Sequence, residues 1–129
     1  MAQDAVVYRD TFYRELKAFL KDLIKVFPDD RDMKVISSTL NIAMMDDPND
    51  KIVKGFYKTL LPQEDLIDRR DPAFFYEVNG ASFGNDTAAS LFNKLHLYWE
   101  SLNEANRKVV WDYIQVLFLV AKTIFVQNA

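Results

Sequence analysis

The stretch from Val109 to Val126, which reads VVWDYIQVLFLVAKTIFV, decides the fold. Its polar character comes only from Asp112, Gln115, Lys122 and Thr123. As a helix it would carry apolar side chains on nearly every face, and such a helix is either surrounded by other helices or placed in lipid. The segments upstream are amphipathic and can surround it. We therefore expect it to be the central helix of a small, soluble, all-α domain.

A membrane-spanning role is the alternative for the same stretch. Its longest run without a charged or amide side chain is Val116–Ala121, whereas a spanning helix needs about 20 apolar residues. Asp112 and Lys122 would each cost about 2.5–3.5 kcal/mol near the centre of a bilayer. The sequence therefore favours a core helix over a tail anchor, and it predicts no membrane partner.

Composition places the chain in the globular class. The 129 residues fit one domain spanning 1–129, with 50% hydrophobic and 27% charged residues. A net charge of -3 gives no overall attraction to nucleic acid. The absence of cysteine excludes disulfides, thiolate metal ligands and a cysteine nucleophile. The N-terminus has no basic segment followed by an apolar run, so we expect an intracellular protein that is not secreted.

Apolar residues at steps of three and four predict the first two helices. The first covers residues 4–27 and ends at Pro28, which disfavours helical geometry in the residue before it. Asp29 and Asp30 offer an N-cap for the second, which ends at the turn formed by residues 46–50. Both helices can pack against the C-terminal stretch.

The middle of the chain is expected to be a series of shorter helices. A third helix over residues 52–60 contains Gly55, which costs about 1 kcal/mol relative to alanine. Pro62 can open a short helix that ends at Asp68. The segment 73–78 could be a strand, but a lone strand has no partner in this chain, so we favour a helical turn.

The last third of the chain predicts a helical hairpin. Residues 79–86 form the longest expected loop, and Asp86 or Thr87 caps the helix that follows. A break near residues 101–104 separates that helix from the final one. Trp99 and Trp111 lie on either side of the break and could meet across the hairpin. The predicted architecture is thus a single-domain bundle of about five to six helices around the C-terminal helix.

No candidate catalytic site stands out. His96 is the only histidine, and no nucleophile motif such as Gly-x-Ser-x-Gly accompanies it. We interpret it as a structural or surface residue; a hydrolase that pairs His96 with nearby carboxylates is the alternative. The glycine-containing segment 80–84 lacks the lysine and Ser/Thr of a phosphate-binding loop. The sequence predicts no enzyme and no cofactor.

Two acidic clusters, at residues 29–32 and 46–50, invite a metal-binding hypothesis. A Ca²⁺ loop of the EF-hand type needs glycine at its sixth position and glutamate at its twelfth. Counting from Asp46, these positions hold Lys51 and Tyr57. Both clusters also stand where helix N-caps are expected, and carboxylates are stabilised there by free backbone N–H groups. We predict capping and no metal.

Two surface hypotheses remain. The aromatic residues around the long loop could form an exposed site for a protein partner: Phe74, Phe75, Tyr76 and Phe83. Four cations recur at helical spacing on the first helix and could contact phosphates or an acidic protein: Arg14, Lys17, Lys21 and Lys25, here called the basic stripe. Interleaved acidic residues lower the potential of this stripe, so an ordinary solvated face is its alternative interpretation.

A sequence pattern near the C-terminus resembles a known group of proteins. Residues 97–102, LYWESL, precede a polar turn, and residues 106–117, NRKVVWDYIQVL, follow it. This resembles uncharacterised short proteins of nucleocytoplasmic large DNA viruses, in which Lys, two residues and Trp-x-Tyr-Leu-Gln-x-Leu follow such a turn. Ile114 replaces one leucine here. Together with the weaker pieces at residues 23–28 and 71–75, the resemblance covers about half of the chain.

The resemblance implies a viral origin, with a location in the host cytoplasm or the virion, and it brings no catalytic residues. We expect a non-enzymatic protein–protein interaction or scaffolding module, for example a structural or virus-factory component. An accessory nucleic-acid-binding or transcription-associated protein that uses the basic stripe is the alternative. A homo-oligomer is compatible with either function.

Overall fold

A computed structural model of the protein describes residues 2–127 and confirms an all-α domain, with no strand in that range. Five helices have ten or more residues, and shorter α-helices and 3-10 segments connect them. In chain order the elements are α1 (Ala2–Val26), α2 (Arg31–Met45), η1 (Pro48–Asp50), α3 (Lys51–Leu60), η2 (Leu61–Gln63), α4 (Glu64–Asp68), α5 (Phe74–Glu77), η3 (Gly80–Phe83), α6 (Asp86–Tyr98), η4 (Trp99–Ser101) and α7 (Glu104–Gln127).

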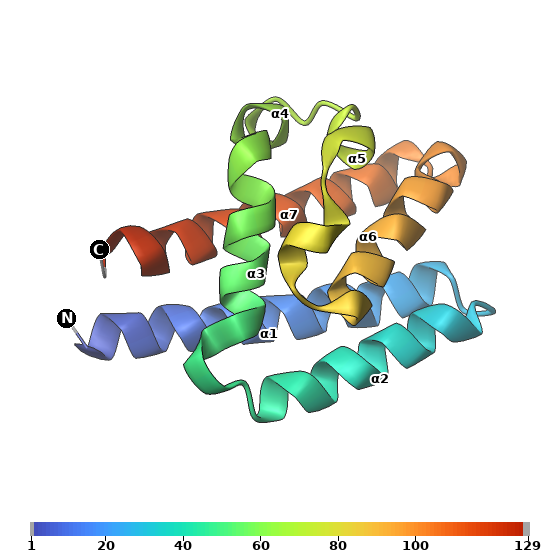
Figure 1. The fold of residues 1–129 in the computed structure, drawn as a ribbon. Helices are drawn as coiled ribbons and strands as arrows, with labels where there is room; N and C mark the ends of the chain where they lie inside the picture. The colour runs from blue at the N-terminus through green and yellow to red at the C-terminus, as the bar shows by residue number, and fades with distance from the viewer. Residues whose placement is uncertain (1, 128–129) are drawn as a thin grey trace.

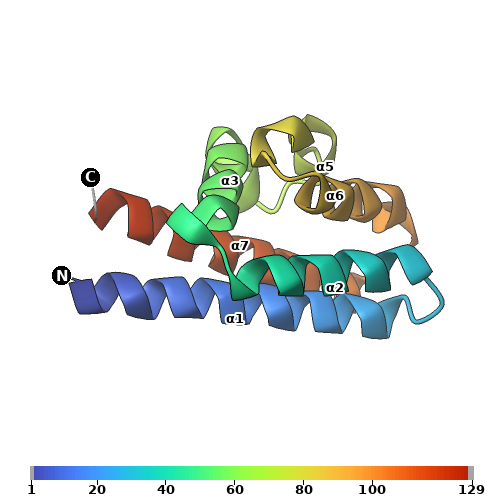
Figure 2. The ribbon, with the colours of Figure 1, turned by 60° about the horizontal axis from the view of Figure 1, so that its bottom comes forward.

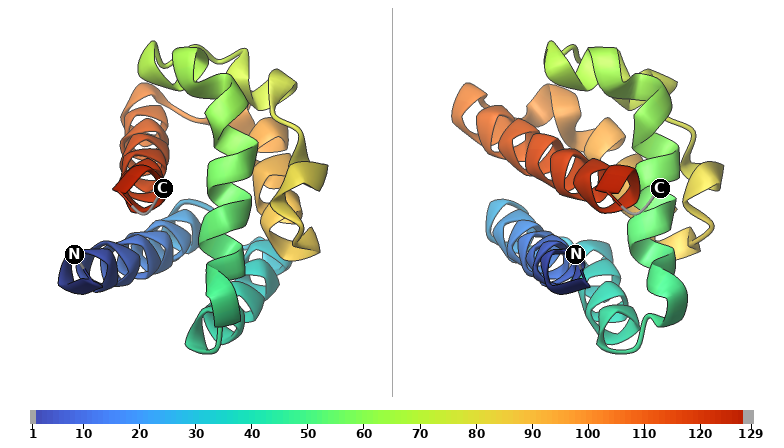
Figure 3. Two further views of the ribbon diagram at one scale, coloured as in Figure 1. Left: turned by 60° about the vertical axis from the view of Figure 1, so that its left-hand side comes forward. Right: turned by 90° about the vertical axis from the view of Figure 1, so that its left-hand side faces the viewer.

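The two longest helices, α1 and α7, run antiparallel and form the most extensive contact in the fold (Figure 1). α2 turns back along α1 and packs on both α1 and α6, as Figure 2 shows. α3 crosses the α1–α7 pair and contacts α7 and η3 (Figure 3). Within residues 73–78 the sequence favoured a helical turn over a strand, and α5 confirms this as a single helical turn.

Side-chain caps fix the beginnings of α2 and α6. Asp30 caps α2 by accepting a 3.0 Å hydrogen bond from the Met33 amide, as predicted. Asn85 caps α6, because its side-chain oxygen accepts from the Thr87 and Ala88 amides. The prediction of Asp86 or Thr87 as that cap was wrong: both residues lie inside the first turn, where an acidic side chain favours the helix dipole.

Aromatic rings occupy much of the core. Phe12, Phe56 and Phe74 are completely buried, and edge-to-face contacts link Phe12 to Phe56. Trp99 and Trp111 meet across the α6–α7 hairpin with ring centroids 5.6 Å apart, which confirms the predicted contact. Such pairs are worth about 0.5–1.5 kcal/mol beyond the area they bury. The tryptophan pair therefore stabilises the hairpin itself.

The close packing of η3 on α3 explains why a glycine stands at position 55 inside a helix. A Cβ atom built on Gly55 would lie 2.2 Å from the backbone oxygen of Phe83. The missing side chain thus lets η3 approach the backbone of α3, and Phe83 enters the core beside Phe56. Glycine lowers the helix propensity of α3, but its lack of a side chain allows this close packing.

The C-terminal helix α7 is not enclosed on all sides, so that prediction was too strong. Ile114 and Leu117 are fully buried against the rest of the chain, but Leu119 is 63% exposed and Val126 is 58% exposed. α1, α3 and α4 cover one side of α7 and leave the other open. Residues 104–126 are long and apolar enough to cross a membrane by length and composition, a test that core helices of soluble proteins also pass.

Candidate interaction surfaces

The predicted aromatic partner surface is not a surface, and this prediction was wrong. Phe74, Phe75 and Phe83 are buried at 3% exposure or less, while Tyr76 alone is 58% exposed. Phe75 stacks on Trp99 with centroids 4.3 Å apart, and Phe74 contacts Trp111. These rings are covered because α5 and η3 fold inward over α6 and α7. A partner can reach only Tyr76.

The basic stripe lies where the sequence placed it, on the outer face of α1. Its four side chains are exposed, and none forms an ion pair or side-chain hydrogen bond with another described residue. Two of the three interleaved acids, Glu15 and Asp22, line a hollow between α1 and α7, whereas Asp10 is exposed one helical turn before Arg14 on the same face. Asp22 accepts a 2.5 Å hydrogen bond from the Tyr113 hydroxyl. The stripe is therefore separated from two of these acids, while Asp10 remains next to its first cation.

His96 is exposed on α6, with neighbours that orient it. Its Nδ1 lies 2.7 Å from the Phe75 carbonyl oxygen, and its ring meets the edge of Tyr76 at a centroid distance of 4.5 Å. The Tyr76 hydroxyl donates in turn to the Glu100 carboxylate at 3.4 Å, whereas no described contact joins His96 itself to a carboxylate. The arrangement links α6 to the end of α5.

In the first acidic cluster, Asp30 is the centre of a part-buried polar network. Asp30, with a side chain only 9% exposed, accepts hydrogen bonds from the Tyr98 hydroxyl and from Lys94 Nζ. Lys94 Nζ also lies 3.3 Å from the Asp32 carboxylate. The hydrogen bond from Tyr98, assisted by the Met33 amide and Lys94, lowers the pKa of Asp30 to about 2. This cluster ties the beginning of α2 to α6.

The second acidic cluster ties η1 to α1. The Tyr13 hydroxyl donates to Asp47 at 2.6 Å and to Asp50 at 3.2 Å, and Asp47 also accepts from the Ile52 amide in the first turn of α3. Burial, reinforced by both carboxylates, raises the pKa of Tyr13. Arg9 Nε lies 2.9 Å from the Asp50 carboxylate. Asp47 and Asp50 therefore already accept hydrogen bonds from protein donors. One of these donors is a backbone amide in the first turn of α3.

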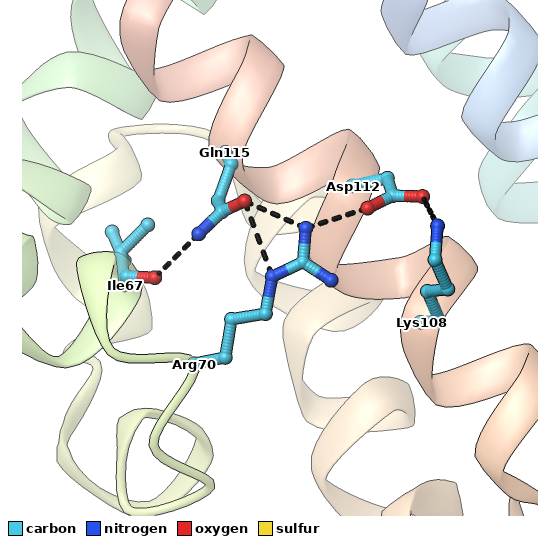
Figure 4. A network of polar contacts seen from close by, with 5 residues as sticks. All are labelled: Ile67, Arg70, Lys108, Asp112 and Gln115. Carbon is cyan, nitrogen blue, oxygen red and sulfur yellow. Dashed lines mark hydrogen bonds and ion pairs between the residues drawn. The ribbon is translucent and has the colours of Figure 1, made fainter.

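A third polar network joins α7 to the turn after α4 (Figure 4). Arg70 donates to Asp112 at 2.5 Å and twice to the Gln115 side-chain oxygen, at 2.7 and 3.2 Å. Gln115 donates in turn to the Ile67 carbonyl oxygen at 3.0 Å, and Lys108 donates to the other oxygen of Asp112. The hydrogen bond from Arg70 lowers the pKa of Asp112. Three of the four polar side chains in this network therefore come from α7.

The adjacent residues Arg69 and Arg70 pair with different parts of the chain. Arg69 pairs locally with Asp65 and Asp71, but Arg70 reaches α7. Arg70 has a positive φ of 52°, and the Asp71 amide bonds back to the Leu66 carbonyl, which is the usual way a glycine ends a helix. The contacts on α7 offset the strain of placing arginine there.

Sequence inspection missed two apolar surfaces. The first, here called the α2 stripe, consists of Val35, Ser38, Ile42 and Met45, all exposed on one face of α2. The second, here called the α7 stripe, is the exposed side of the C-terminal helix: Val109, Val116, Leu119 and Val126. The residues of the α2 stripe follow each other at steps of three and four, and those of the α7 stripe at steps of seven and three. Spacing finds such apolar faces, but it cannot tell which of two faces is covered.

Two hollows border the α7 stripe. One, of about 370 Å³, lies between α1 and α7 and is lined by Glu15, Asp22, Asp112 and Tyr113 beside Val109 and Val116. The other, of about 280 Å³, lies between α4 and α7 and contains Glu64 and Asp68 as well as Lys122, which donates to Glu64 at 2.5 Å. Carboxylates thus flank the α7 stripe on both sides, whereas no charged residue interrupts α2 between Val35 and Met45.

Within residues 2–127, no group of three His, Asp or Glu side chains is placed to hold one metal ion. The described polar clusters each join two helical elements through ion pairs and hydrogen bonds. Comparison of the chain with protein-family models, with curated proteins and with solved structures gives no match. Three surfaces of the described part of the chain are the candidate sites: the basic stripe, the α2 stripe and the α7 stripe.

Proposed function

We propose that this protein is a non-enzymatic protein–protein interaction or scaffolding module. The observation that supports the proposal is the pair of exposed apolar stripes on α2 and α7. Scattered exposed apolar residues are ordinary, but a row of them along one helix face is how a helix packs against another helix. The charged clusters described above join elements of the fold, so the apolar faces offer the partner sites. The viral resemblance suggests a role in a virion or a virus factory.

The proposal is tested by placing charge on each stripe separately. The double variants I42E/M45E and V116E/L119E should remain folded, because all four positions face solvent, and each would block its own stripe. L97E is the matched control, since Leu97 is 68% exposed on α6 and belongs to neither stripe. Circular dichroism first verifies that each variant is folded.

Affinity isolation of the tagged full chain from producing cells then gives candidate partners, and binding is remeasured with purified components. Loss of a reconstituted partner with one stripe variant, but not with L97E, supports the proposal. A partner that binds both stripe variants as well as wild type contradicts the assignment to these surfaces.

The basic stripe supports a second candidate function, binding to nucleic acid. Its four cations extend along α1 from Arg14 to Lys25, about 16 Å at 1.5 Å per residue. They are exposed and unpaired among the described residues, and each contact with a phosphate would release counterions. This candidate requires only the outer face of α1 and leaves both apolar stripes free.

Fluorescence anisotropy with duplex and single-stranded DNA across a range of salt tests the second candidate. The K17E/K21E variant should bind much more weakly, and the slope of log K against log salt should fall by about 0.9 for each duplex phosphate that the variant no longer neutralises. K51E/K54E is the control, because Lys51 and Lys54 are exposed on α3, away from the stripe. Absence of binding at low salt, or equally weakened binding in both variants, would refute the candidate.

A further inference from the structure

Among the described residues, the α2 stripe is the most exposed apolar face. Val35 is 62% exposed, Ile42 is 70% exposed and Met45 is 81% exposed, while Ser38 is an exposed small residue between them. The opposite face of the same helix is buried by α1 and α6, through Met33, Ile36, Leu40 and Met44. α2 lies at the edge of the fold, and Figures 1 and 2 show no other element over its outer side.

The charges at the two ends of the α2 stripe are of opposite sign. Arg31 and Lys34 stand at its N-terminal end, and Asp46 stands at its C-terminal end. All three are exposed, and none has an ion pair or side-chain hydrogen bond with another described residue.

The other acids near these two ends are directed elsewhere or lie off the helix. Asp32 contacts Lys94 on α6, while Asp47 and Asp50 contact Tyr13 on α1. Asp29 precedes the cap residue and lies in the turn before α2. The stripe therefore presents an uncharged apolar centre with a positive end and a negative end.

We propose that α2 packs antiparallel against α2 of a second copy of this chain. The inference rests on the proposed function and specifies its partner for one of the two stripes. An antiparallel pair brings the positive end of each stripe beside the negative end of the other, whereas a parallel pair would bring like charges together. The two-fold relation also closes the assembly at a dimer, since each copy uses the same face.

The spacing of the stripe allows a definite register. With Val35 opposite Met45 of the partner subunit, Ser38 falls opposite Ile42 of the partner subunit, and the same contacts repeat across the two-fold axis. Alternating steps of three and four residues are the pattern by which apolar side chains of two helices interlock. Ser38 near the centre lets the helix axes approach closely. Lys34 of each copy then lies near Asp46 of the partner subunit.

The α7 stripe is a weaker candidate for the same contact. Asp112 stands between Val109 and Val116 on that face, and acidic residues line the hollows on both sides. Two copies of this face would bring carboxylates together. On the α2 stripe, no carboxylate lies between Val35 and Met45.

The dimer should be weak and reversible. α2 has 15 residues, about 22 Å of helix, and one face of that length is smaller than the roughly 800 Å² that each partner contributes to a standard stable interface. We therefore expect a dissociation constant in the micromolar range, visible as a rise in mass with concentration.

Sedimentation velocity of the full chain over about a hundredfold range of concentration tests the proposal. Wild type and L97E should shift from monomer to dimer, and I42E/M45E should stay monomeric, with association weakened by at least about tenfold. A wild type that remains monomeric overturns the proposal, and so does a dimer that I42E/M45E leaves intact. If wild type is monomeric but I42E/M45E fails to bind a different reconstituted partner, self-association fails while the interaction function stands.

Charge reversal tests the antiparallel direction. K34E alone and D46K alone should each weaken the dimer, because each places like charges together at both ends. An equimolar mixture of the two variants should associate again, because every end of that mixed dimer pairs opposite charges. A mixture no better than the single variants contradicts the antiparallel arrangement.

Cross-linking gives an independent readout, since the wild-type chain has no cysteine. Val35→Cys and Met45→Cys chains carrying different tags are mixed under mild oxidation. The antiparallel register predicts the mixed disulfide in excess over both like-with-like products. Predominant like-with-like products would indicate a parallel pair and overturn the proposal.

Discussion

The aromatic segment from Phe74 to Phe83 and the outer face of α2 differ in the burial of their large apolar side chains. The first buries three phenylalanines in a short, irregular segment, and the second exposes Val35, Ile42 and Met45 on a regular helix. The aromatic segment is covered because α3, α6 and α7 surround it, whereas α2 has neighbours on one side only. Burial thus follows the number of packed neighbours, and regular secondary structure does not guarantee it.

The largest test of this comparison removes a ring from the aromatic segment. Phe74→Ala should lower the free energy of unfolding by about 3–5 kcal/mol, because it leaves a cavity beside Phe75, Phe92 and Trp111. Urea denaturation followed by circular dichroism measures the loss. Tyr76→Ala, at the exposed neighbour, should cost under about 1 kcal/mol. Equal losses in the two variants would contradict the assignment of Phe74 to the core.

The second test concerns the contact that brings the aromatic segment inward. In an exposed helix, replacing glycine by alanine stabilises by about 1 kcal/mol. Gly55→Ala should instead destabilise by about 1–3 kcal/mol, because the new Cβ atom would collide with the Phe83 carbonyl oxygen and force α3 and η3 apart. Lys54→Ala on the same helix is the control. A Gly55→Ala protein more stable than wild type would refute the close approach.

The third test concerns the polar cluster that anchors α2. The pKa of Asp30 is about 2 in the folded protein and 3.8 for an unperturbed aspartate, so the charged form stabilises the fold. That contribution is complete above about pH 4 and disappears as the pH falls toward 2.

Asp30→Asn should therefore lose less stability than wild type over this acid range, by on the order of 2 kcal/mol. Chemical denaturation at a series of pH values measures the difference. Asp29→Asn, at the exposed neighbour, should follow the wild-type curve. If the free energy of unfolding of Asp30→Asn and of wild type changed equally with pH, the contacts of Asp30 would not stabilise its charged form.

The smallest expected effect is on the α2 stripe. Ile42→Ser should change the free energy of unfolding by at most about 0.5 kcal/mol in dilute solution, because the side chain is already in water. Leu40→Ala, on the buried face of the same helix, should cost about 2–5 kcal/mol. A large loss for Ile42→Ser in the monomer would mean that the outer face of α2 is covered by its own chain.

The sequence by itself determined the all-α class, most helix boundaries and the Trp99–Trp111 contact. These depend on residues close in the chain: steps of three and four, Pro28 after the first helix, and Asp30 as a cap. It also placed the basic stripe on one outer face, because charged side chains at helical spacing favour solvent.

Only the tertiary structure decided which apolar faces are covered. Phe74 and Phe83 are in the core and Ile42 is outside because of how α3, α5 and η3 pack, and no local pattern encodes that packing. The partners of Arg70 and Gly55 were hidden for the same reason, since they lie on α7 and η3, far along the chain. Spacing gives each helix its faces, and the sum of long-range contacts determines which face remains in water.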